Sequence, residues 1–168
     1  MFKVNDYIMY GTTGVCKIIE IKKEKFLGRQ EMEYYILEPV YFKNTVIKIP
    51  VDNTTIKMRE VLSKEDIEEL INVIPNIETE WINDDKTRSE HFKTMLKSGD
   101  CEDLIALIRT IYLNKKDRKS LGKKLYKVDD EIMQAAEKLL NEEVAFVLGI
   151  DSKAVPKYIS SHIKEQNI

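Results

Sequence analysis

The first third of the chain alternates apolar and polar residues, a pattern typical of β-strands that bury one face. This alternation predicts strands that span residues 7–10, 15–21, 32–37 and 45–49. Glycine and asparagine residues between them predict tight connections at residues 11–14, 26–30 and 42–44. Short strands at this spacing favour a small, strongly bent antiparallel barrel. Such a barrel has at least one open edge, which is available for pairing with a strand of another protein.

From residue 59 onward the apolar residues recur with the period of an α-helix. Ser63 and Asp66 have the spacing of a capping box, and Pro75 ends the first predicted helix. Later helices are predicted at residues 78–97, from Asp100 along an apolar stripe to Tyr112, at residues 124–148, and from Asp151 onward. We therefore predict a multidomain α+β protein, with a small antiparallel barrel in residues 1–58 and an all-α helical bundle in residues 59–168.

Composition is that of a globular chain, since 43% of the 168 residues are hydrophobic and 33% are charged. Met1 leads straight into a predicted strand without a basic-then-apolar leader, and no apolar run has membrane-spanning length. We therefore expect a cytoplasmic protein that makes no membrane contact. Cys16 and Cys101 lie far apart and lack Cys-x-x-Cys spacing, which argues against a disulfide framework or a zinc site.

Few residues have the arrangement that catalysis requires. His91 and His162, the only histidines, stand alone on predicted helices without metal-ligand spacing to a carboxylate or cysteine. Cys101 lies at a predicted helix start, but its acidic neighbours oppose formation of a thiolate. The six glycines are scattered as turn residues and form no phosphate-binding loop. We therefore expect no catalytic residue, no metal, no cofactor and no small-molecule ligand, with a thiol activity at Cys101 as the least favoured alternative.

Charge is distributed unevenly along the chain. The formal net charge of −2 argues against a protein that coats nucleic acid indiscriminately. Residues 115–127 nevertheless contain a single acidic residue, Asp117, among many basic ones. The basic residues are Lys115, Lys116, Arg118, Lys119, Lys123, Lys124 and Lys127. One interpretation is a solvated segment between helices, and the other is a set of phosphate contacts.

Trp81, the only tryptophan, stands beside a polar stretch that contains no large apolar side chain. On the predicted helix it lies about three turns before the apolar end, on the same side but past the packed segment. Two interpretations follow. The indole either packs as a plug against Ile71 and Ile74, or forms an exposed apolar wedge flanked by Lys86 and Arg88. Proteins that bend or open duplex DNA from the minor groove use apolar wedges.

The order and spacing of several short segments resemble the CarD/CdnL family of bacterial transcription regulators. These segments are FKVNDYIMY at 2–10, GV at 14–15, EYYIL at 33–37, KIPV at 48–51, MREV at 58–61 and SGD at 98–100. The likeness extends from residue 2 to about residue 150. Its N-terminal part also resembles the polymerase-interacting module of the transcription-repair coupling factor.

The resemblance implies a Tudor-like barrel, residues 1–58, that binds the β subunit of RNA polymerase, followed by a helical DNA-binding domain, residues 59–168. It also implies that Trp81 wedges into the minor groove at the upstream edge of the melted promoter, which stabilises the open complex. Contact with promoter DNA is expected to be largely independent of sequence. The alternative is a pure protein adaptor on RNA polymerase, with Trp81 buried and no direct DNA contact.

The resemblance and the charge pattern together nominate site residues. Candidates for polymerase binding are Lys25, Phe26, Ile47 and Lys48. Lys48 falls where the family often has an arginine, so a bidentate contact with a carboxylate would become a single point charge. Glu24 falls where the family has a second basic residue. Candidates for DNA binding are Trp81, Lys86, Arg88, Lys93, Lys115, Lys116, Arg118, Lys123, Lys124 and Lys127.

Overall fold

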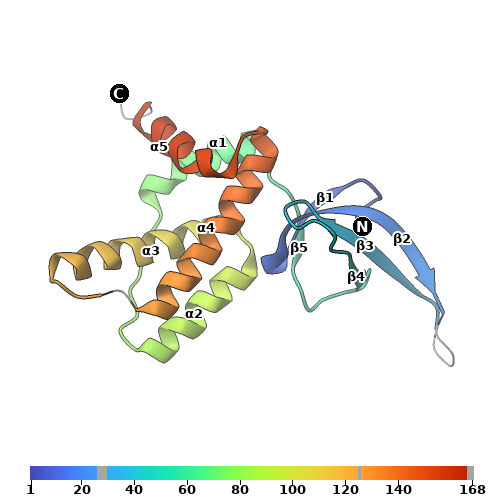
Figure 1. The fold of residues 1–168 in the computed structure, drawn as a ribbon, viewed down its shortest axis with the longest axis horizontal. Coiled ribbons are helices and arrows are strands. Elements are labelled where there is room, and N and C mark those ends of the chain that lie inside the picture. The colour runs from blue at the N-terminus through green and yellow to red at the C-terminus, as the bar shows by residue number, and fades with distance from the viewer. Residues whose placement is uncertain (26–29, 125, 166–168) are drawn as a thin grey trace. The chain divides into compact units, whose positions relative to one another are not determined.

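The computed structural model of the chain describes residues 1–25, 30–124 and 126–165, without the side chains of residues 164 and 165. The chain divides into two compact units, Met1–Val61 and Leu62–Ile168, of which the first holds the strands and the second the α-helices (Figure 1). The expected combination of a small antiparallel β domain and a helical domain is therefore confirmed.

The first unit is a single antiparallel sheet with the strand order β4-β3-β2-β1-β5. Its strands are β1 (Tyr7–Tyr10), β2 (Gly14–Glu24), β3 (Met32–Pro39), β4 (Ile47–Pro50) and β5 (Met58–Glu60). The predicted strands correspond to the first four of these. The pattern missed β5, because three residues are too few for an alternation to show, and this strand is identified only by its pairing with β1.

Two local features bend this sheet around its core. Gly14 starts β2 with a φ of 92°, a backbone conformation that glycine adopts without steric cost. The register of β2 against β3 shifts between Ile18 and Glu20, and such a bulge increases the local twist. The core of the unit is formed by Ile8, Tyr10, Cys16, Ile18, Tyr35, Leu37 and Ile49. The strand order ends in β4 and β5, which are the two edges of the sheet in the described part of the chain.

The second unit contains the α-helices, of which the first three begin at side-chain caps. They are α1 (Lys64–Val73), α2 (Asp85–Ser98), α3 (Cys101–Ser120), α4 (Lys127–Leu148) and α5 (Val155–Glu165), with 3₁₀ turns η1 (Gly11–Thr13, in the first unit), η2 (Ile74–Asn76) and η3 (Ser152–Ala154). Ser63 and Asp66 form the predicted capping box of α1. Gly99 and Gly149 adopt the left-handed conformation that ends α2 and α4.

The predicted start of the second helix is wrong. The helix was expected from residue 78, but α2 begins at Asp85 because the carboxylate of Asp84 accepts a hydrogen bond from the backbone N–H of Thr87. Trp81 therefore precedes the helix instead of lying on it. The start of α4 is also later than predicted, at Lys127 in place of residue 124.

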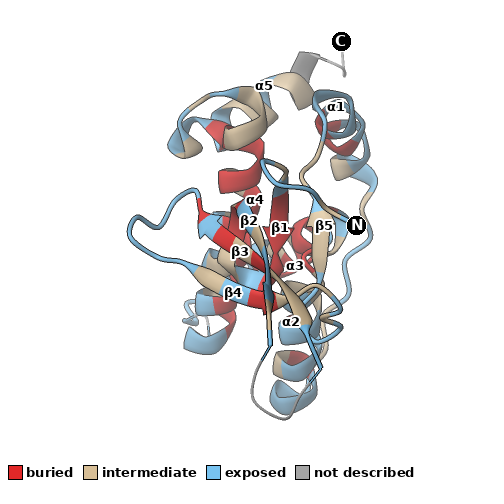
Figure 2. Cartoon of the chain, turned by 90° about the vertical axis from the view of Figure 1, so that its right-hand side faces the viewer, coloured by how far each residue is buried: buried red, intermediate tan, exposed pale blue. Residues whose placement is uncertain are grey.

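The helices bury two groups of apolar residues. Helices α1, α3, α4 and α5 enclose one cluster, which contains Ile67, Leu70, Ile71, Cys101, Ile105, Leu140, Val144, Ala145 and Val155. Buried side chains on α2, α3 and α4 include Phe92, Leu104, Leu107, Ile111, Ile132, Ala136 and Leu139. Figure 2 shows the buried residues along α4.

Tyr112, which the predicted apolar stripe of the third helix places inward, is 58% exposed, so that prediction is wrong. No helix in the described ranges has both the length and the apolarity needed to cross a membrane.

Candidate interaction surfaces

Trp81 lies in the irregular segment between η2 and α2 and is half-buried. Its ring meets the ring of Phe92 edge-on, with centroids 6.2 Å apart at an angle of 60°. Phe92 is 1% exposed, so the indole rests on the interior of the helical unit. Trp81 therefore shares features of both interpretations made from the sequence. Its ring packs on Phe92 like a plug, and the residue remains partly accessible as a wedge requires.

Arg88 provides the second support for the indole. Its guanidinium carbon lies 4.4 Å from the centroid of the Trp81 ring, and the side chain is 2% exposed. Nε donates to Asp129 Oδ2 at 3.1 Å, and Nη2 lies 3.0 Å from the same oxygen in an ion pair. Nη2 donates to Asp85 Oδ1 at 2.8 Å. Nη1 donates to the backbone carbonyls of Ile82 at 2.9 Å and Asn83 at 3.4 Å. The guanidinium therefore joins α2, α4 and the segment that carries Trp81.

These contacts stabilise the charged form of Arg88 in spite of its burial. Desolvation is the largest single influence and lowers the pKa of the guanidinium, but the hydrogen bonds with Asp85 and Asp129 together reverse it, so the pKa is raised. A buried pair of this kind is costly to break, because removal of one partner leaves an uncompensated charge that costs about 3–5 kcal/mol.

The same guanidinium also contacts a second aromatic ring. Its carbon is 4.8 Å from the centroid of Tyr126, and the guanidinium carbon of Arg118 is 4.3 Å from that centroid. Arg118 Nε in turn donates to the carbonyl of Lys124 at 2.7 Å. Cation–π contacts contribute about 0.5–2 kcal/mol each. We call Trp81, Arg88, Tyr126 and Arg118 the aromatic–arginine cluster.

The geometry of Arg88 differs from the surface position that the sequence predicted for it. Arg88 was expected to flank Trp81 on the surface and to hold a phosphate of DNA. A phosphate contact requires accessible N–H groups, whereas this guanidinium is 2% exposed and its donors are directed at groups of the protein. Arg88 therefore supports Trp81 from inside.

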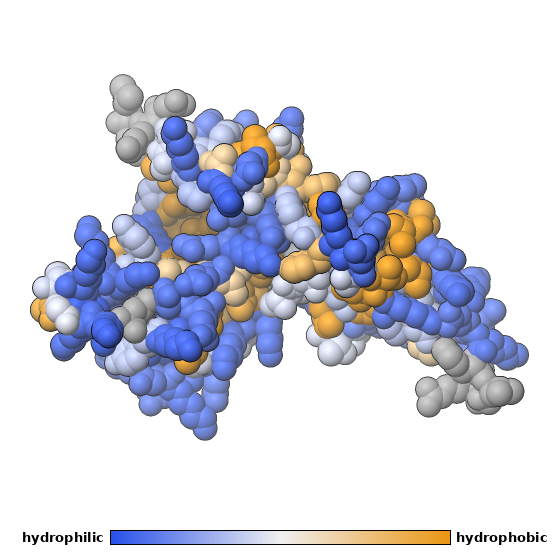
Figure 3. Space-filling model, in the orientation of Figure 1, coloured by the Kyte–Doolittle hydropathy of each residue, from blue (hydrophilic) through white to orange (hydrophobic). Residues whose placement is uncertain are grey.

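The other basic candidates lie at the surface, on α2 and around the end of α3. Lys86 and Lys93 project from α2, and Lys116, Lys123 and Lys124 are exposed near the α3–α4 turn; none of these five forms an ion pair in the described part of the chain. Lys115 pairs with Asp130 at 3.2 Å, and Lys127 pairs with Glu131 at 3.6 Å. Figure 3 shows that hydrophilic side chains cover most of α2 and α3 on the face in view.

Lys48, the central polymerase-binding candidate, lies on the edge strand β4. Its Nζ is 4.3 Å from the ring centroid of Tyr34, and it forms an ion pair with Glu24, which also pairs with Lys22 at 3.2 Å. The hydrogen bond from Lys48 is the main cause, and that from Lys22 the second, of a lowered pKa for the Glu24 carboxyl. The structure therefore brings Glu24 into direct contact with the proposed contact lysine.

The remaining polymerase-binding candidates are dispersed around this edge. Ile47 pairs with Leu37, whereas Lys48 pairs with Ile36, so the two side chains point to opposite faces of the sheet. Ile47 packs against the core of the first unit. Lys25 is exposed just after β2. Phe26 lies outside the described residues.

The sequence patterns did not indicate two groups of residues that contribute to these surfaces. The connection between β3 and β4 exposes large apolar side chains next to the edge strand, at Val40, Tyr41, Phe42 and Val46. The partners of Arg88 were also missed. The spacing of three residues between Asp85 and Arg88 was a usable signal, since residues three apart are neighbours on a helix. Asp129 gave no such signal, because it is 41 residues away in the chain.

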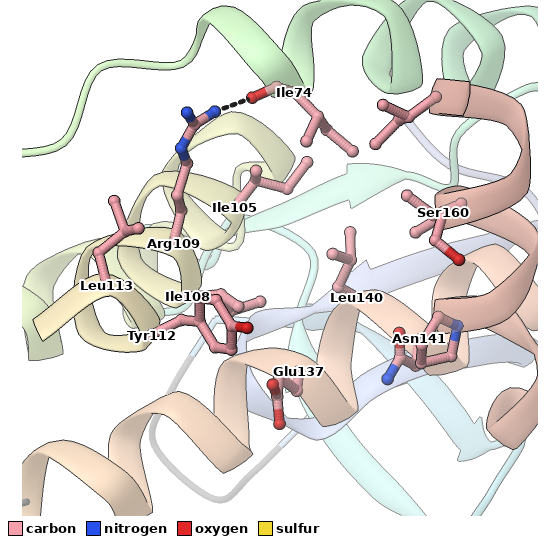
Figure 4. Close-up of a pocket in the computed structure, with 13 residues that line it drawn as sticks. Ile74, Ile105, Ile108, Arg109, Tyr112, Leu113, Glu137, Leu140, Asn141 and Ser160 are labelled. Carbon is pink, nitrogen blue, oxygen red and sulfur yellow. Dashed lines mark hydrogen bonds between the residues drawn. The ribbon is translucent and has the colours of Figure 1, made fainter. Parts of the chain in front are cut away.

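A cavity of about 500 Å³ opens among α3, α4 and α5, but no candidate residue lines it. Its walls are mostly aliphatic, and Figure 4 shows Arg109 on one side with its guanidinium bonded to the carbonyl of Ile74. Glu137 lies in the wall formed by α4, where burial raises the pKa of its carboxyl.

The cysteines are placed where thiol chemistry is disfavoured. Cys16 is 0% exposed and burial raises its pKa to about 12. Cys101 is 6% exposed, and its thiol donates to Glu143 Oε2 at 3.4 Å. Within the described ranges, no three His, Cys, Asp or Glu side chains gather in a way that could hold a metal ion.

Comparison with known proteins matches both units to family models. The model described as CarD-like/TRCF RID domain matches residues 2–62, and the model described as CarD, C-terminal domain matches residues 69–160. The second match alone covers more than half of the chain. No curated protein matches the sequence.

The two acidic partners of Arg88 provide a matched test of the buried ion pair. We expect Asp129→Asn to lower the free energy of unfolding by about 3 kcal/mol, because Asp129 is buried with the guanidinium. Asp85→Asn removes a carboxylate that is 66% exposed and is expected to cost less than about 1 kcal/mol. Urea unfolding of both variants measures the difference, and equal losses would contradict this account of the pair.

The buried thiols lead to a second prediction. Neither Cys16 nor Cys101 should react with iodoacetamide in the native protein, because alkylation requires an accessible thiolate. Both should be labelled in urea, as measured by intact mass spectrometry. Selective labelling of Cys101 under native conditions would revive a thiol activity at that residue.

Proposed function

The chain belongs to the CarD family, and on that premise we propose that it is a non-enzymatic initiation factor that holds promoter DNA open while bound to RNA polymerase. Its two family domains are non-catalytic interaction domains and mark a transcription-associated protein that interacts with RNA polymerase. In the proposal, a barrel domain of residues 1–58 attaches to the β subunit. A helical domain of residues 59–168 contacts DNA at the upstream edge of the melted region.

The way in which Trp81 is supported is the observation that carries this proposal. A wedge between base steps needs an apolar side chain that is accessible yet held in place while it displaces stacked bases. Trp81 has both properties, because its ring is half-buried and rests on Phe92 and on the fixed guanidinium of Arg88. The exposed side chain of Lys86, on the first turn of α2, supplies a positive charge nearby.

The exposed lysines would position the helical domain on the DNA backbone. Lys86, Lys93, Lys116, Lys123 and Lys124 are accessible to phosphates, whereas Lys115 and Lys127 would first have to leave their acidic partners. Phosphate contacts set position and orientation but do not read base sequence. We therefore propose DNA contact that is largely independent of sequence.

The edge strand β4 is the proposed attachment site for the polymerase β subunit. It is an edge strand of the sheet in the described part of the chain, it carries Lys48, and the preceding connection exposes apolar residues such as Phe42. Edge strands pair with strands of partner proteins through main-chain hydrogen bonds.

We propose that the chain, as a factor bound to RNA polymerase, acts in the cytoplasm, where it meets the nucleoid through the polymerase.

A pure adaptor on RNA polymerase is the second candidate. The contact of Trp81 with Phe92 and Arg88 favours it, because these contacts also occur in an indole that serves only to pack the helical unit. The two candidates differ in whether Trp81 matters to DNA after polymerase has been bound.

We expect Trp81→Ala to shorten the lifetime of the open complex at a weak promoter by about tenfold, equivalent to roughly 1.4 kcal/mol of lost wedge contact. Binding to RNA polymerase should remain unchanged, because Trp81 lies in the helical unit. Tyr112→Ala is the matched control, since this exposed aromatic residue lies on α3 of the same unit. An unchanged lifetime with Trp81→Ala would favour the pure adaptor.

The attachment site is tested by removing one charge from each edge of the sheet. We expect Lys48→Gln to weaken binding to purified RNA polymerase by about threefold to tenfold, through loss of a charged contact at β4. Lys57→Gln removes the same charge beside β5, at the other edge, and should have little effect. Equal weakening by both variants, measured by biolayer interferometry, would show that β4 is not the attachment site.

A further inference from the structure

We infer that Arg88 and Tyr126 are positioning residues, which hold the Trp81 indole in one orientation and connect it to the basic turn at residues 121–124. This inference rests on the proposed wedge function, and it adds the means by which the wedge is held and the surface to which it is linked. The aromatic–arginine cluster contains the contacts that carry it.

The segment around Trp81 needs support from outside itself. It lies between the end of η2 at Asn76 and the start of α2 at Asp85, where the backbone forms neither helix nor strand. The orientation of the indole is therefore not set by regular backbone hydrogen bonds. It depends on the contacts of the ring and of the residues that follow it.

Arg88 supplies both kinds of support. Its guanidinium lies against the indole, and its Nη1 donates to the carbonyls of Ile82 and Asn83, the two residues directly after Trp81. The guanidinium is itself fixed by Asp129 on α4. Ring and chain thus contact the same buried group, and that group is paired with Asp129 in the first turn of α4.

Tyr126, the residue just before α4, extends this arrangement to the surface. Its ring shares the Arg88 guanidinium with Trp81, and its side chain is 39% exposed. Arg118 lies over the same ring and donates to the carbonyl of Lys124. The backbone N–H of Lys123 donates to the carbonyl of Arg118 at 2.8 Å.

The turn that carries Lys123 and Lys124 is therefore connected to Trp81 through successive contacts of Arg118 with Tyr126, Tyr126 with Arg88, and Arg88 with the indole. A phosphate held at this turn restricts Arg118 and Tyr126, and through them Arg88. Ordering of the indole before it meets DNA removes part of the entropy cost of insertion. Phosphate contact and wedge insertion then favour each other, as two events that share one ordered element do.

The position of the indole can be measured without DNA, because Trp81 is the only tryptophan. We expect the Tyr126→Leu change in the full-length protein to increase the amplitude of fast indole motion by about twofold in time-resolved fluorescence anisotropy, since the ring that shares Arg88 is lost. Tyr126→Phe keeps a ring face for the two guanidinium groups and should restore the native decay. Tyr112→Leu removes an exposed tyrosine elsewhere on the unit and should leave the decay unchanged.

An unchanged anisotropy decay with Tyr126→Leu would overturn the positioning role, whatever the fate of the wedge. Failure of Tyr126→Phe to restore the decay would overturn it as well, because the ring face would then not be the operative group. Circular dichroism and urea unfolding of the three variants verify that the helical unit stays folded.

A double-mutant cycle on open-complex lifetime tests the connection to function. Tyr126→Leu alone is expected to shorten the lifetime by about threefold to fivefold, and to have no further effect in the Trp81→Ala background. Independent, additive effects would mean that Tyr126 contacts DNA directly, which contradicts a role through Trp81. If Trp81→Ala itself leaves the lifetime unchanged, the wedge function fails, while the anisotropy series still decides whether Tyr126 positions the indole.

Discussion

The helical unit depends on a charge that it buries. Arg88 is 2% exposed, yet its guanidinium makes hydrogen bonds to two carboxylates and two backbone carbonyls. Each bond offsets part of the desolvation cost that an isolated buried cation would incur. Because the partners come from α2, α4 and the segment after Trp81, the same requirement that keeps the charge satisfied also fixes the place of the indole. An apolar replacement of Arg88 could fill this volume but could not hold the two carbonyls.

Sequence patterns predicted the elements of this fold better than they predicted the site. The alternation in strands such as Tyr7–Tyr10 and the cap at Ser63 act over a few residues, so they are visible in one dimension. The pair of Arg88 and Asp129 spans 41 residues and could not be inferred from spacing. For the same reason Arg88 was interpreted as a surface cation. The prediction of a helix start at residue 78 was wrong because the apolar period extends into the segment before Asp84. The helix itself begins only after the cap at Asp84.

The ion pair at the sheet edge is partly exposed, whereas the ion pair of Arg88 with Asp129 is buried. Lys48 has a carboxylate partner in Glu24, but both side chains are partly exposed, at 36% and 24%. Exposed ion pairs contribute between about 0 and 1 kcal/mol, so Lys48 can exchange Glu24 for a carboxylate of a partner at low cost. Lys22 remains with Glu24 after such an exchange. A lysine suits this arrangement, since a point charge on a flexible stem changes partners without a fixed bidentate geometry.

The net charge of −2 and the local basic turn are compatible if, as proposed, the first unit attaches the chain to polymerase and only the helical unit contacts DNA. A factor that reaches promoter DNA on polymerase acts at an effective concentration in the millimolar range, so its own affinity for DNA can be weak. Weak affinity limits binding to DNA elsewhere, which a strongly basic chain could not avoid. Under the proposed function, the helical unit needs few phosphate contacts, but it needs a wedge whose orientation does not change on contact. The buried guanidinium beside Trp81 suits the proposed wedge, because the indole is supported by contacts within the protein and not by charge directed at DNA.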